Sequence, residues 1–171
     1  MPETKTVVEG RFLRLVDTNG WEFVQRTRST GVVCIVAITP DRRLLLVEQF
    51  RPPLGRYTVE LPAGLSGDVE DALESLETAA RRELLEETGY EASQWTRVCD
   101  VVSSAGLTDE TVTVFRASQL KRTESGGGDA TESIVVHEVD LENLTNWLAD
   151  AARHGKSIDS RVYGVMTFLK V

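Results

Sequence analysis

Alternating and continuous apolar runs, separated by turn residues, fill the first third of the chain. Val7–Leu15 and Trp21–Arg28 alternate apolar and polar positions on either side of Asn19-Gly20, and an Asn-Gly pair in this setting is a strong hairpin signal. Gly31–Thr39 is continuously apolar, which is typical of a strand buried on both faces. Arg43–Glu48 follows a Pro-Asp turn and predicts a strand that pairs back on it. The pattern therefore predicts N-terminal antiparallel strands that lead into a buried sheet.

The remainder of the chain predicts further strands interspersed with helices. The predicted strands are Tyr57–Leu61, Trp95–Ser103, Glu110–Ala117 and Ile134–Val139, and the predicted helices are Glu74–Thr88, Glu142–His154 and Asp159–Leu169. Lys121–Ala130 is polar, contains three consecutive glycines and predicts a mobile surface loop. Strands flanked by helices predict the α/β class, with a mixed sheet between helices. We expect one domain over residues 1–171, and the N-terminal strands at 1–30 belong to it.

One face of the predicted helix over Glu74–Thr88 is apolar in its first part and acidic in its last part. At about 100° per residue, the residues that share one face are Leu73, Leu76, Ala79 and Ala80, and that face continues as Glu83, Glu86 and Glu87. The opposite face, which includes Glu74 and Arg81, is expected to face solvent. Three carboxylates at this spacing repel one another, and partial burial strengthens the repulsion. Arg82 is one source of compensating charge, and a hard divalent cation with oxygen ligands is another. A solvated acidic face is the alternative, but a stripe continuous with the buried face favours a metal site.

Length, charge and cysteine content exclude several classes of protein. The 171 residues suffice for one domain with a core, and 27% charged and 41% apolar residues are typical of a globular protein. No apolar run is long enough to span a membrane, and the N-terminal residues lack a signal-peptide layout, so we expect a cytoplasmic protein without a membrane partner. The net charge of −8 disfavours nucleic acid as a partner. Cys34 and Cys99 are expected to be reduced core residues.

The acidic stripe belongs to a motif with a known counterpart. Residues 82–90, Arg-Glu-Leu-Leu-Glu-Glu-Thr-Gly-Tyr, resemble the core of the Nudix box, Gly-x5-Glu-x7-Arg-Glu-U-x-Glu-Glu-x-Gly-U, where U is aliphatic. Glu74 stands at the required distance before Arg82, and Tyr90 occupies an aliphatic position. The opening Gly does not fit, since Asp68 stands in its place; Gly64 fits if the following loop is four residues longer than the pattern. Reading Glu70 as the box Glu is the less favoured alternative, because it places the four extra residues in the helix.

The resemblance extends beyond the box. Glu48–Pro52 and Glu60–Gly64 are similar to segments of the Nudix branch that contains ADP-ribose and nucleoside-diphosphate-sugar pyrophosphatases, so the likeness covers about Val32 to Ile158. The resemblance implies an α/β/α sandwich in which the box forms a loop, a helix and a loop. It also implies that the strands within 1–30 are a dimerisation element, because this branch uses extra N-terminal strands in swapped homodimers.

The resemblance carries a metal site onto this chain. It implies that Glu83, Glu86 and Glu87 bind Mg²⁺, with Mn²⁺ as the alternative, and that the Ala63 carbonyl completes the coordination. Carboxylates on a rigid helix hold such ions at fixed spacing. Arg82 is expected to pair with the box carboxylates and orient them. Glu74 is expected to stabilise the loop–helix junction rather than bind metal.

The general base of this branch often comes from a loop outside the box. The candidate stretch is 126–137, and Glu132 at the end of the Gly-rich loop is our choice of catalytic base. A solvated loop carboxylate is the alternative for Glu132, and Glu124 and Glu138 are the next candidates for the base.

The candidate substrate-binding residues come from three segments. Arg51 can bind phosphate oxygens in a bidentate way, with Arg56 a weaker candidate, and Glu60 can hydrogen-bond a ribose or a base. The segment 103–110 lies where the branch has a substrate loop, and Ser104, Gly106 and Glu110 are its candidate contacts. Trp21 or Phe23 could stack on a base, although aromatic residues in strands are more often core or interface residues.

The sequence thus predicts a Mg²⁺-dependent pyrophosphohydrolase that cleaves nucleoside diphosphate sugars to a nucleoside monophosphate and a sugar 1-phosphate. ADP-ribose specialists of the branch typically have Pro where this chain has Ala105, which favours a broader or hexose preference. Hydrolysis of nucleoside triphosphates or dinucleotides is one alternative. A module that senses a nucleotide sugar without hydrolysing it is another, although the intact box disfavours it.

Overall fold

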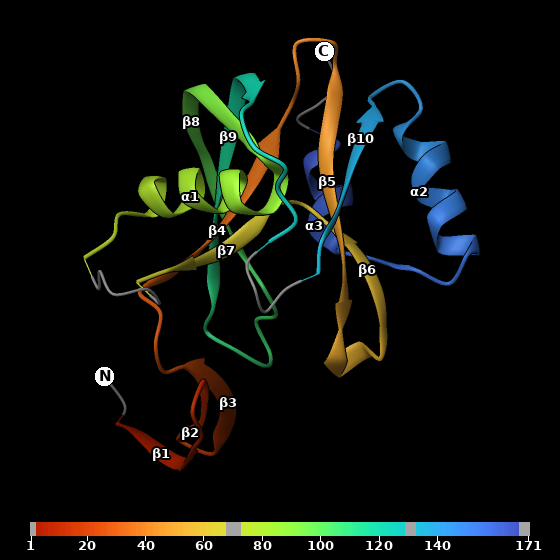
Figure 1. The fold of residues 1–171 in the computed structure, drawn as a ribbon. Helices are drawn as coiled ribbons and strands as arrows, with labels where there is room; N and C mark the ends of the chain where they lie inside the picture. The colour runs from red at the N-terminus through yellow and green to blue at the C-terminus, as the bar shows by residue number, and fades with distance from the viewer. Residues whose placement is uncertain (1–2, 68–72, 129–132, 168–171) are drawn as a thin grey trace.

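A computed structural model of the chain describes residues 3–67, 73–128 and 133–167 (Figure 1). The strands are β1 Thr4–Glu9, β2 Leu13–Thr18, β3 Trp21–Arg26, β4 Gly31–Ala37, β5 Arg43–Arg51, β6 Arg56–Glu60, β7 Ala63–Ser66, β8 Tyr90–Val102, β9 Thr111–Arg122, β10 Val135–Asp140 and β11 Ser157–Ile158. The helices are α1 Leu76–Thr88, α2 Leu144–Arg153 and α3 Ser160–Val165, with a 3₁₀ turn, η1, at Pro52–Leu54. Among these elements, no helix is long and apolar enough to cross a membrane.

The strands form three sheets, and two of them are mixed. In the order β7-β4-β9-β8 only β4 and β9 are parallel, and in the order β10-β5-β6-β11 only β6 and β11 are parallel. The third sheet, β1-β2-β3, is antiparallel and lies apart from the other two at the bottom of Figure 1. The α/β class is confirmed, with two mixed sheets where the sequence predicted one.

Helices cover the two faces of the mixed sheets, and the alternation of β4 explains why. Val33, Ile35 and Ala37 pack with α1, β8 and β9 in one apolar cluster. The intervening residues of β4 pack with α2, α3, β5, β6 and β10 in a second cluster. Successive side chains of a strand point to opposite faces, so the continuously apolar run serves both layers. Figure 1 shows α1 on one side of the sheets and α2 on the other, as an α/β/α sandwich requires.

The N-terminal sheet forms around the predicted Asn-Gly turn. Asn19 and Gly20 have φ angles of 55° and 83°, and the flanking Thr18 and Trp21 are paired. Positive φ at both central residues is the backbone geometry of the hairpin turn that Asn-Gly favours. The predicted strand over Val7–Leu15 is two strands, β1 and β2, because the chain turns back between them. The N-terminal element is therefore a three-stranded sheet.

The box helix starts later than its apolar pattern suggests. Ser75 is the N-cap and its hydroxyl accepts a hydrogen bond from the Thr78 backbone, so Glu74 and Leu73 precede the helix. Leu73 was expected on the buried face but is 92% exposed, because a residue before the N-cap does not follow the helical period. Gly89 ends the helix with a φ of 74°, as predicted for a C-cap.

The C-terminal elements differ from the prediction in two places. The last helix, α3, is shorter than the expected range Asp159–Leu169, of which 168–169 lie outside the described residues, and Asp159 is its N-cap. Before it, β11 pairs in parallel with β6, joining Ser157 to Thr58 and Ile158 to Val59. Two residues are too short a run to give a period, so the sequence did not reveal this strand. Its position brings the start of α3 against β6.

Candidate active site

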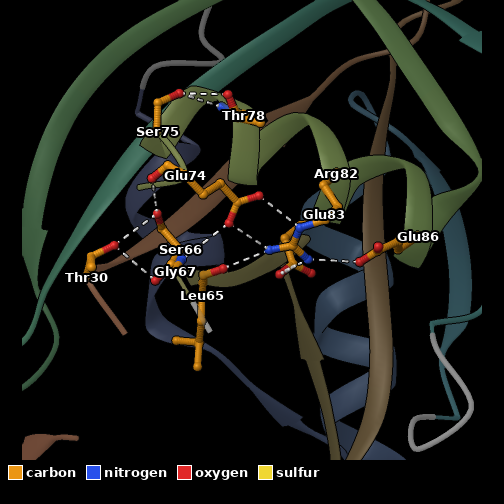
Figure 2. Close-up of polar contacts among 10 residues, drawn as sticks. All are labelled: Thr30, Leu65, Ser66, Gly67, Glu74, Ser75, Thr78, Arg82, Glu83 and Glu86. Carbon is orange, nitrogen blue, oxygen red and sulfur yellow. Dashed lines mark hydrogen bonds and ion pairs between the residues drawn. The ribbon is translucent and has the colours of Figure 1, made fainter. Parts of the chain in front are cut away.

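Arg82 is the centre of an ion-pair cluster on the box helix (Figure 2). Its Nη1 atom donates to Glu83 Oε1 at 2.9 Å and to Glu86 Oε2 at 3.0 Å. Its Nε atom donates to Glu74 Oε1 at 3.0 Å, and its Nη2 atom donates to the Leu65 carbonyl at 2.9 Å. These contacts raise the pKa of Arg82, chiefly through the hydrogen bond to Glu74. The charged guanidinium group therefore contacts three carboxylates at once and offsets part of their mutual repulsion, which is compatible with its predicted orienting role.

Glu74 joins the box helix to the end of β7. Besides its bonds to Arg82, its carboxylate accepts a hydrogen bond from the Gly67 backbone, and its backbone carbonyl accepts one from the Ser66 hydroxyl (Figure 2). The hydrogen bond from Arg82 holds the pKa of Glu74 below its ordinary value. The side chain is only 5% exposed, so its expected position on the solvent face is wrong. The contacts fit the predicted role at the loop–helix junction.

Glu83 and Glu87 are the two acidic side chains of the stripe that turn toward β7. The Glu83 side chain is 12% exposed and lies against Gly64, where an added Cβ would be 1.9 Å from its Cδ atom. Glu87 is 2% exposed, and its carboxylate accepts a hydrogen bond of 3.0 Å from the Ala63 backbone. Glycine at position 64 thus leaves room for Glu83, which fits the choice of Gly64 as the opening residue of the box. Asp68 and Glu70 lie outside the described residues.

The described residues include no group of three Asp, Glu, His or Cys side chains already arranged around one point as a metal would need. Arg82 lies between Glu83 and Glu86, and the Glu86 side chain is 45% exposed. The donor set nevertheless suits a hard cation, because Glu83, Glu87 and Ala63 line the same cavity and offer oxygen ligands.

A cavity of about 280 Å³ joins the box to the other candidate residues. The predicted site residues that line it are Arg51, Ala63, Glu83, Glu87 and Glu110. Two further arginines line it that the sequence analysis did not identify, Arg26 of β3 and Arg161 of α3. The cavity lining thus combines carboxylates with guanidinium groups, a combination that suits a metal–phosphate complex.

Arg51 is held by Glu60 across the β5–β6 pair. Its Nε and Nη2 atoms donate to the two Glu60 oxygens at 2.7 and 2.6 Å, and the Glu60 side chain is buried. Bidentate pairing fixes the plane of the guanidinium group. Glu60 therefore contacts Arg51 directly, and it lines a second cavity next to the first.

Arg26 lines the cavity and is hydrogen-bonded to the loop after β8. Its Nε atom donates to Glu110, which also accepts a hydrogen bond from the Ser103 hydroxyl. Burial opposes ionisation of Glu110, but these two hydrogen bonds outweigh it and hold the pKa of Glu110 below its ordinary value. Gln25 and Asp109 form a neighbouring contact, so β3 and the loop are joined at two successive positions.

Arg161 is the residue of the site that the sequence analysis missed most completely. Its Nε and Nη2 atoms donate to the two Asp159 oxygens at 2.8 and 2.7 Å. The hydrogen bond to Asp159 raises the pKa of Arg161 despite its burial. The spacing Asp-x-Arg at the start of a helix is the one local signal that could have indicated a positioned arginine.

The remaining predicted contacts do not line the cavity in the part of the chain that the structure describes. The Ser104 carbonyl accepts hydrogen bonds from the backbone of Leu107 and Thr108, and Gly106 faces open space. Glu132 lies outside the described residues. Glu138, a reserve candidate for the base, accepts a hydrogen bond of 2.6 Å from the Tyr90 hydroxyl.

Relatives of known name cover most of the chain. The chain is 31% identical over 155 residues to "Methanol dehydrogenase activator" of Bacillus methanolicus, covering 86% of this chain and 82% of the relative. It is 34% identical over 169 residues to "ADP-sugar pyrophosphatase" of Mus musculus, covering 90% and 75%. It is 40% identical over 114 residues to "ADP-ribose pyrophosphatase" of Bacillus subtilis, covering 66% and 60%.

A solved structure and a family model agree with these relatives. The structure "Crystal structure of ADP compounds hydrolase" superposes with a TM-score of 0.63 over 84% of this chain and 80% of that chain, at 24% sequence identity, which supports the fold. The model of the NUDIX domain matches residues 27–159, a span that contains the acidic helix, the Arg82 cluster and most of the cavity lining. The chain belongs to the NUDIX domain family.

Proposed function

We propose that the protein is a Mg²⁺-dependent pyrophosphohydrolase that cleaves nucleoside diphosphate sugars to a nucleoside monophosphate and a sugar 1-phosphate. One observation carries the proposal: Glu83 and Glu87 share a cavity with Arg26, Arg51 and Arg161. A pyrophosphate link carries negative charge that metal ions and arginines both neutralise. The names of the pyrophosphatase relatives support the same class of substrate.

The metal ligands in this proposal are Glu83, Glu86, Glu87 and the carbonyl of Ala63. Bound Mg²⁺ would neutralise phosphate oxygens and lower the pKa of a coordinated water. The chain's own residues prepare the site: Arg82 orients the Glu83 carboxylate, and the backbone N–H of Ala63 fixes that of Glu87. Glu86 also accepts a hydrogen bond from Arg82, through one of its two carboxylate oxygens. Mn²⁺ remains the alternative metal, since it prefers the same oxygen ligands.

Arg51 and Glu110 are the proposed substrate-side residues, with Arg26 and Arg161 added to them. The pairs Arg51–Glu60 and Arg161–Asp159 present guanidinium groups in fixed orientations to the cavity. Positioned arginines match phosphate oxygens without the entropic cost of ordering a long side chain at the moment of binding. Ser104 and Gly106 stay candidate contacts of the substrate loop, Glu60 stays a candidate contact of the ribose or base, and Glu132 stays the candidate base.

Product analysis tests the proposal. The purified protein would be incubated with Mg²⁺ and ADP-ribose, ADP-glucose, GDP-mannose, UDP-glucose or one nucleoside triphosphate, each with a chelator control. We expect metal-dependent release of nucleoside monophosphate from the diphosphate sugars, and the Ala105 argument predicts that hexose substrates rank with or above ADP-ribose. Cleavage of the triphosphate alone would place the substrate in another class. Binding without cleavage of any compound would favour a sensing module.

We also propose that the chain forms a homodimer through the strands within 1–30. All six residues of β1 are exposed, and Val7, Val8, Phe12 and Trp21 are large apolar side chains at the surface of the N-terminal sheet. Exposed apolar side chains gathered on one element are typical of an interface. Light scattering after size exclusion measures the mass directly, and a monomer at every concentration would reject the proposal. A cytoplasmic location, and the lack of nucleic-acid and membrane partners, stay predictions from the sequence.

A further inference from the structure

The last turn of α1 carries two of the proposed metal ligands, Glu86 and Glu87, without a basic residue to balance them. Carbonyl groups at the end of a helix have no partners within the helix and carry partial negative charge. Two carboxylates beside such carbonyl groups make that end less stable, because like charges gather there. The helix therefore needs hydrogen-bond donors from another element to hold the backbone of these ligands in place.

Backbone amides of residues 123–128, which we call the glycine loop, supply these donors. The Gly127 N–H donates to the Glu87 carbonyl at 2.9 Å, and the Gly128 N–H donates to the Glu86 carbonyl at 3.0 Å. The sequence predicts a mobile surface loop here, whereas the structure shows the glycine loop hydrogen-bonded to the end of α1 (Figure 1). The two residues that receive these bonds are the same two proposed metal ligands.

Two glycines allow the loop to approach the helix this closely. Gly126 has a φ angle of 69°, and a Cβ atom on it would lie 2.4 Å from the carbonyl carbon of Thr88. A Cβ atom on Gly89 would lie 2.3 Å from the carbonyl oxygen of Glu124. Turning a side chain cannot relieve such contacts, because the obstructing atoms belong to the backbone. The loop and the helix end therefore pack backbone against backbone, and both positions require glycine.

The glycine loop is itself anchored at both ends. It directly follows β9, and the Gly127 carbonyl accepts a hydrogen bond of 3.2 Å from the backbone of Ile134, the buried residue before β10. These two strands belong to the two mixed sheets. Donors held by two sheets have fixed positions, and a site keeps its geometry when its supporting groups are rigid. Because Ala63 of β7 donates to the Glu87 carboxylate, this residue is held at both its backbone and its side chain.

We propose that the glycine loop is a positioning element of the metal site, which fixes the backbone of Glu86 and Glu87 so that their carboxylates can bind one divalent cation. The proposal rests on the proposed function, because it takes these two residues as metal ligands. Gly126 acts through the end of the helix and contacts neither cation nor substrate. Since Mg²⁺ tolerates little deviation from its preferred geometry, a shift of this backbone should weaken the cation more than the substrate.

Gly126→Ala is the test variant. Ordinary contact starts at 3.4 Å, so the loop and Thr88 have to separate by about 1.0 Å, from 2.4 to 3.4 Å. A misplacement of about 1 Å in a catalytic site can cost about 10²-fold in rate, and the loop and the helix share it here, so we expect kcat/KM at low Mg²⁺ to fall about 10- to 100-fold. Gly155→Ala is the matched control, because its φ of 82° imposes the same kind of strain while a Cβ atom there meets nothing within 4 Å.

Two measurements separate positioning of the metal site from loss of folded protein. Electron paramagnetic resonance of free Mn²⁺ gives the affinity of the substrate-free protein for the cation, and Gly126→Ala should weaken it about 10-fold or more. In hydrolysis of ADP-ribose, added Mg²⁺ should restore much of the rate by mass action, whereas KM for ADP-ribose at saturating Mg²⁺ should stay nearly unchanged. Urea unfolding gives the stability of each variant, and the Mn²⁺ affinity of Gly155→Ala should equal that of the wild type.

Gly127→Ala replaces the test variant if Gly126→Ala does not fold. A Cβ atom at Gly127 would lie 3.9 Å from the Ile134 carbonyl oxygen, which is ordinary contact. Its φ of 114° is strained for alanine, however, so the amide that donates to Glu87 has to turn. We expect a smaller loss of Mn²⁺ affinity in the same direction, and an unchanged affinity would count against the positioning role.

The outcomes distinguish this role from the proposed function. Equal Mn²⁺ affinity in the wild type and in Gly126→Ala would overturn the positioning role and leave the proposed function standing. Equal weakening in Gly126→Ala and Gly155→Ala would assign the effect to backbone strain, which also overturns the role. A wild-type protein that binds no Mn²⁺ would overturn both the role and the metal site. Mn²⁺ binding that depends on Gly126, without cleavage of any nucleotide sugar, would support the role and reject the proposed function.

Discussion

Gly64 is the position at which one added methyl group tests the proposed metal site most directly. It lies in β7 opposite α1, and a Cβ atom there would be 1.9 Å from Glu83 Cδ and 2.0 Å from Glu83 Oε1. Ordinary contact starts at 3.4 Å, so in Gly64→Ala the carboxyl carbon has to move by about 1.5 Å, from 1.9 to 3.4 Å. The obstructing atoms belong to the end of a side chain rather than to backbone, so the helix and the strand can keep their places.

The size of the expected effect follows from this displacement. Mg²⁺ requires ligands at about 2.0–2.1 Å in near-octahedral geometry, and a misplacement of about 1 Å in a catalytic site can cost about 10²-fold in rate. We therefore expect kcat/KM to fall about 100-fold and the Mg²⁺ concentration for half-maximal activity to rise. Turning Glu83 away from its rotamer costs about 0.5–1.5 kcal/mol, so the free energy of unfolding should fall only slightly.

The assay is nucleoside monophosphate release over a Mg²⁺ titration, together with urea unfolding. Gly164→Ala is the control, because a Cβ atom at Gly164 meets nothing within 4 Å and alanine is the better helix residue in α3. Glu83→Asp shortens the clashing side chain by one methylene. The double variant Gly64→Ala with Glu83→Asp should therefore lose less kcat/KM than the two single losses multiplied together. Unchanged kcat/KM and Mg²⁺ dependence in Gly64→Ala would refute the assignment of Glu83 as a ligand.

Further predictions concern charge and burial. Arg82→Met leaves Glu74 and Glu83 without their common cation and should lower the free energy of unfolding, measured by urea, by about 3–5 kcal/mol. A decrease below about 1 kcal/mol would show that the cluster is not stabilising. Arg82 lowers the pKa of Glu74 in the folded protein, so near the ordinary pKa of a glutamate the unfolded chain binds more protons than the folded chain. The stability that this ion pair contributes is therefore complete above the ordinary pKa. It is lost as the pH falls through the lower pKa of the folded state. Urea midpoints at about pH 7 and about pH 4 should therefore differ less in Glu74→Gln than in the wild type, and equal differences would contradict the sign argument. Burial raises the pKa of the Cys34 thiol to about 12, so a thiol reagent should modify Cys99 alone in the folded protein and both cysteines in denaturant; rapid modification of both in the folded protein would mean that the core around Cys34 opens.

The motif residues could be predicted because their spacing is local. Arg82 and its glutamates lie within one helix, and the stripe that turns from apolar to acidic is a property of the helical period alone. The same period misplaced Leu73 and Glu74, because the pattern does not reveal that Ser75 caps the helix and ends the period there.

The arginines of the cleft illustrate what a sequence pattern cannot supply. Arg26 meets Glu110 across 84 positions of sequence, and Arg161 reaches the same cavity because a two-residue strand pairs with β6. The periodic pattern of the sequence reveals neither contact, because each depends on how elements far apart in the chain pair. Arg51 could be identified only through its likeness to a known segment, and its pairing with Glu60 across two strands is not visible in the sequence.

The boundaries of the family match and of the cleft do not coincide. The NUDIX domain match spans residues 27–159, whereas Arg26 stands one residue before it and Arg161 two residues after it. A protein trimmed to the matched span would keep Glu83, Glu87 and Arg51 but lose the other two arginines that the described cavity contains. Domain boundaries drawn from the family match would thus keep the acidic residues of this cleft and discard two of its three arginines. Truncated versions of the chain should therefore be cut well outside both arginines.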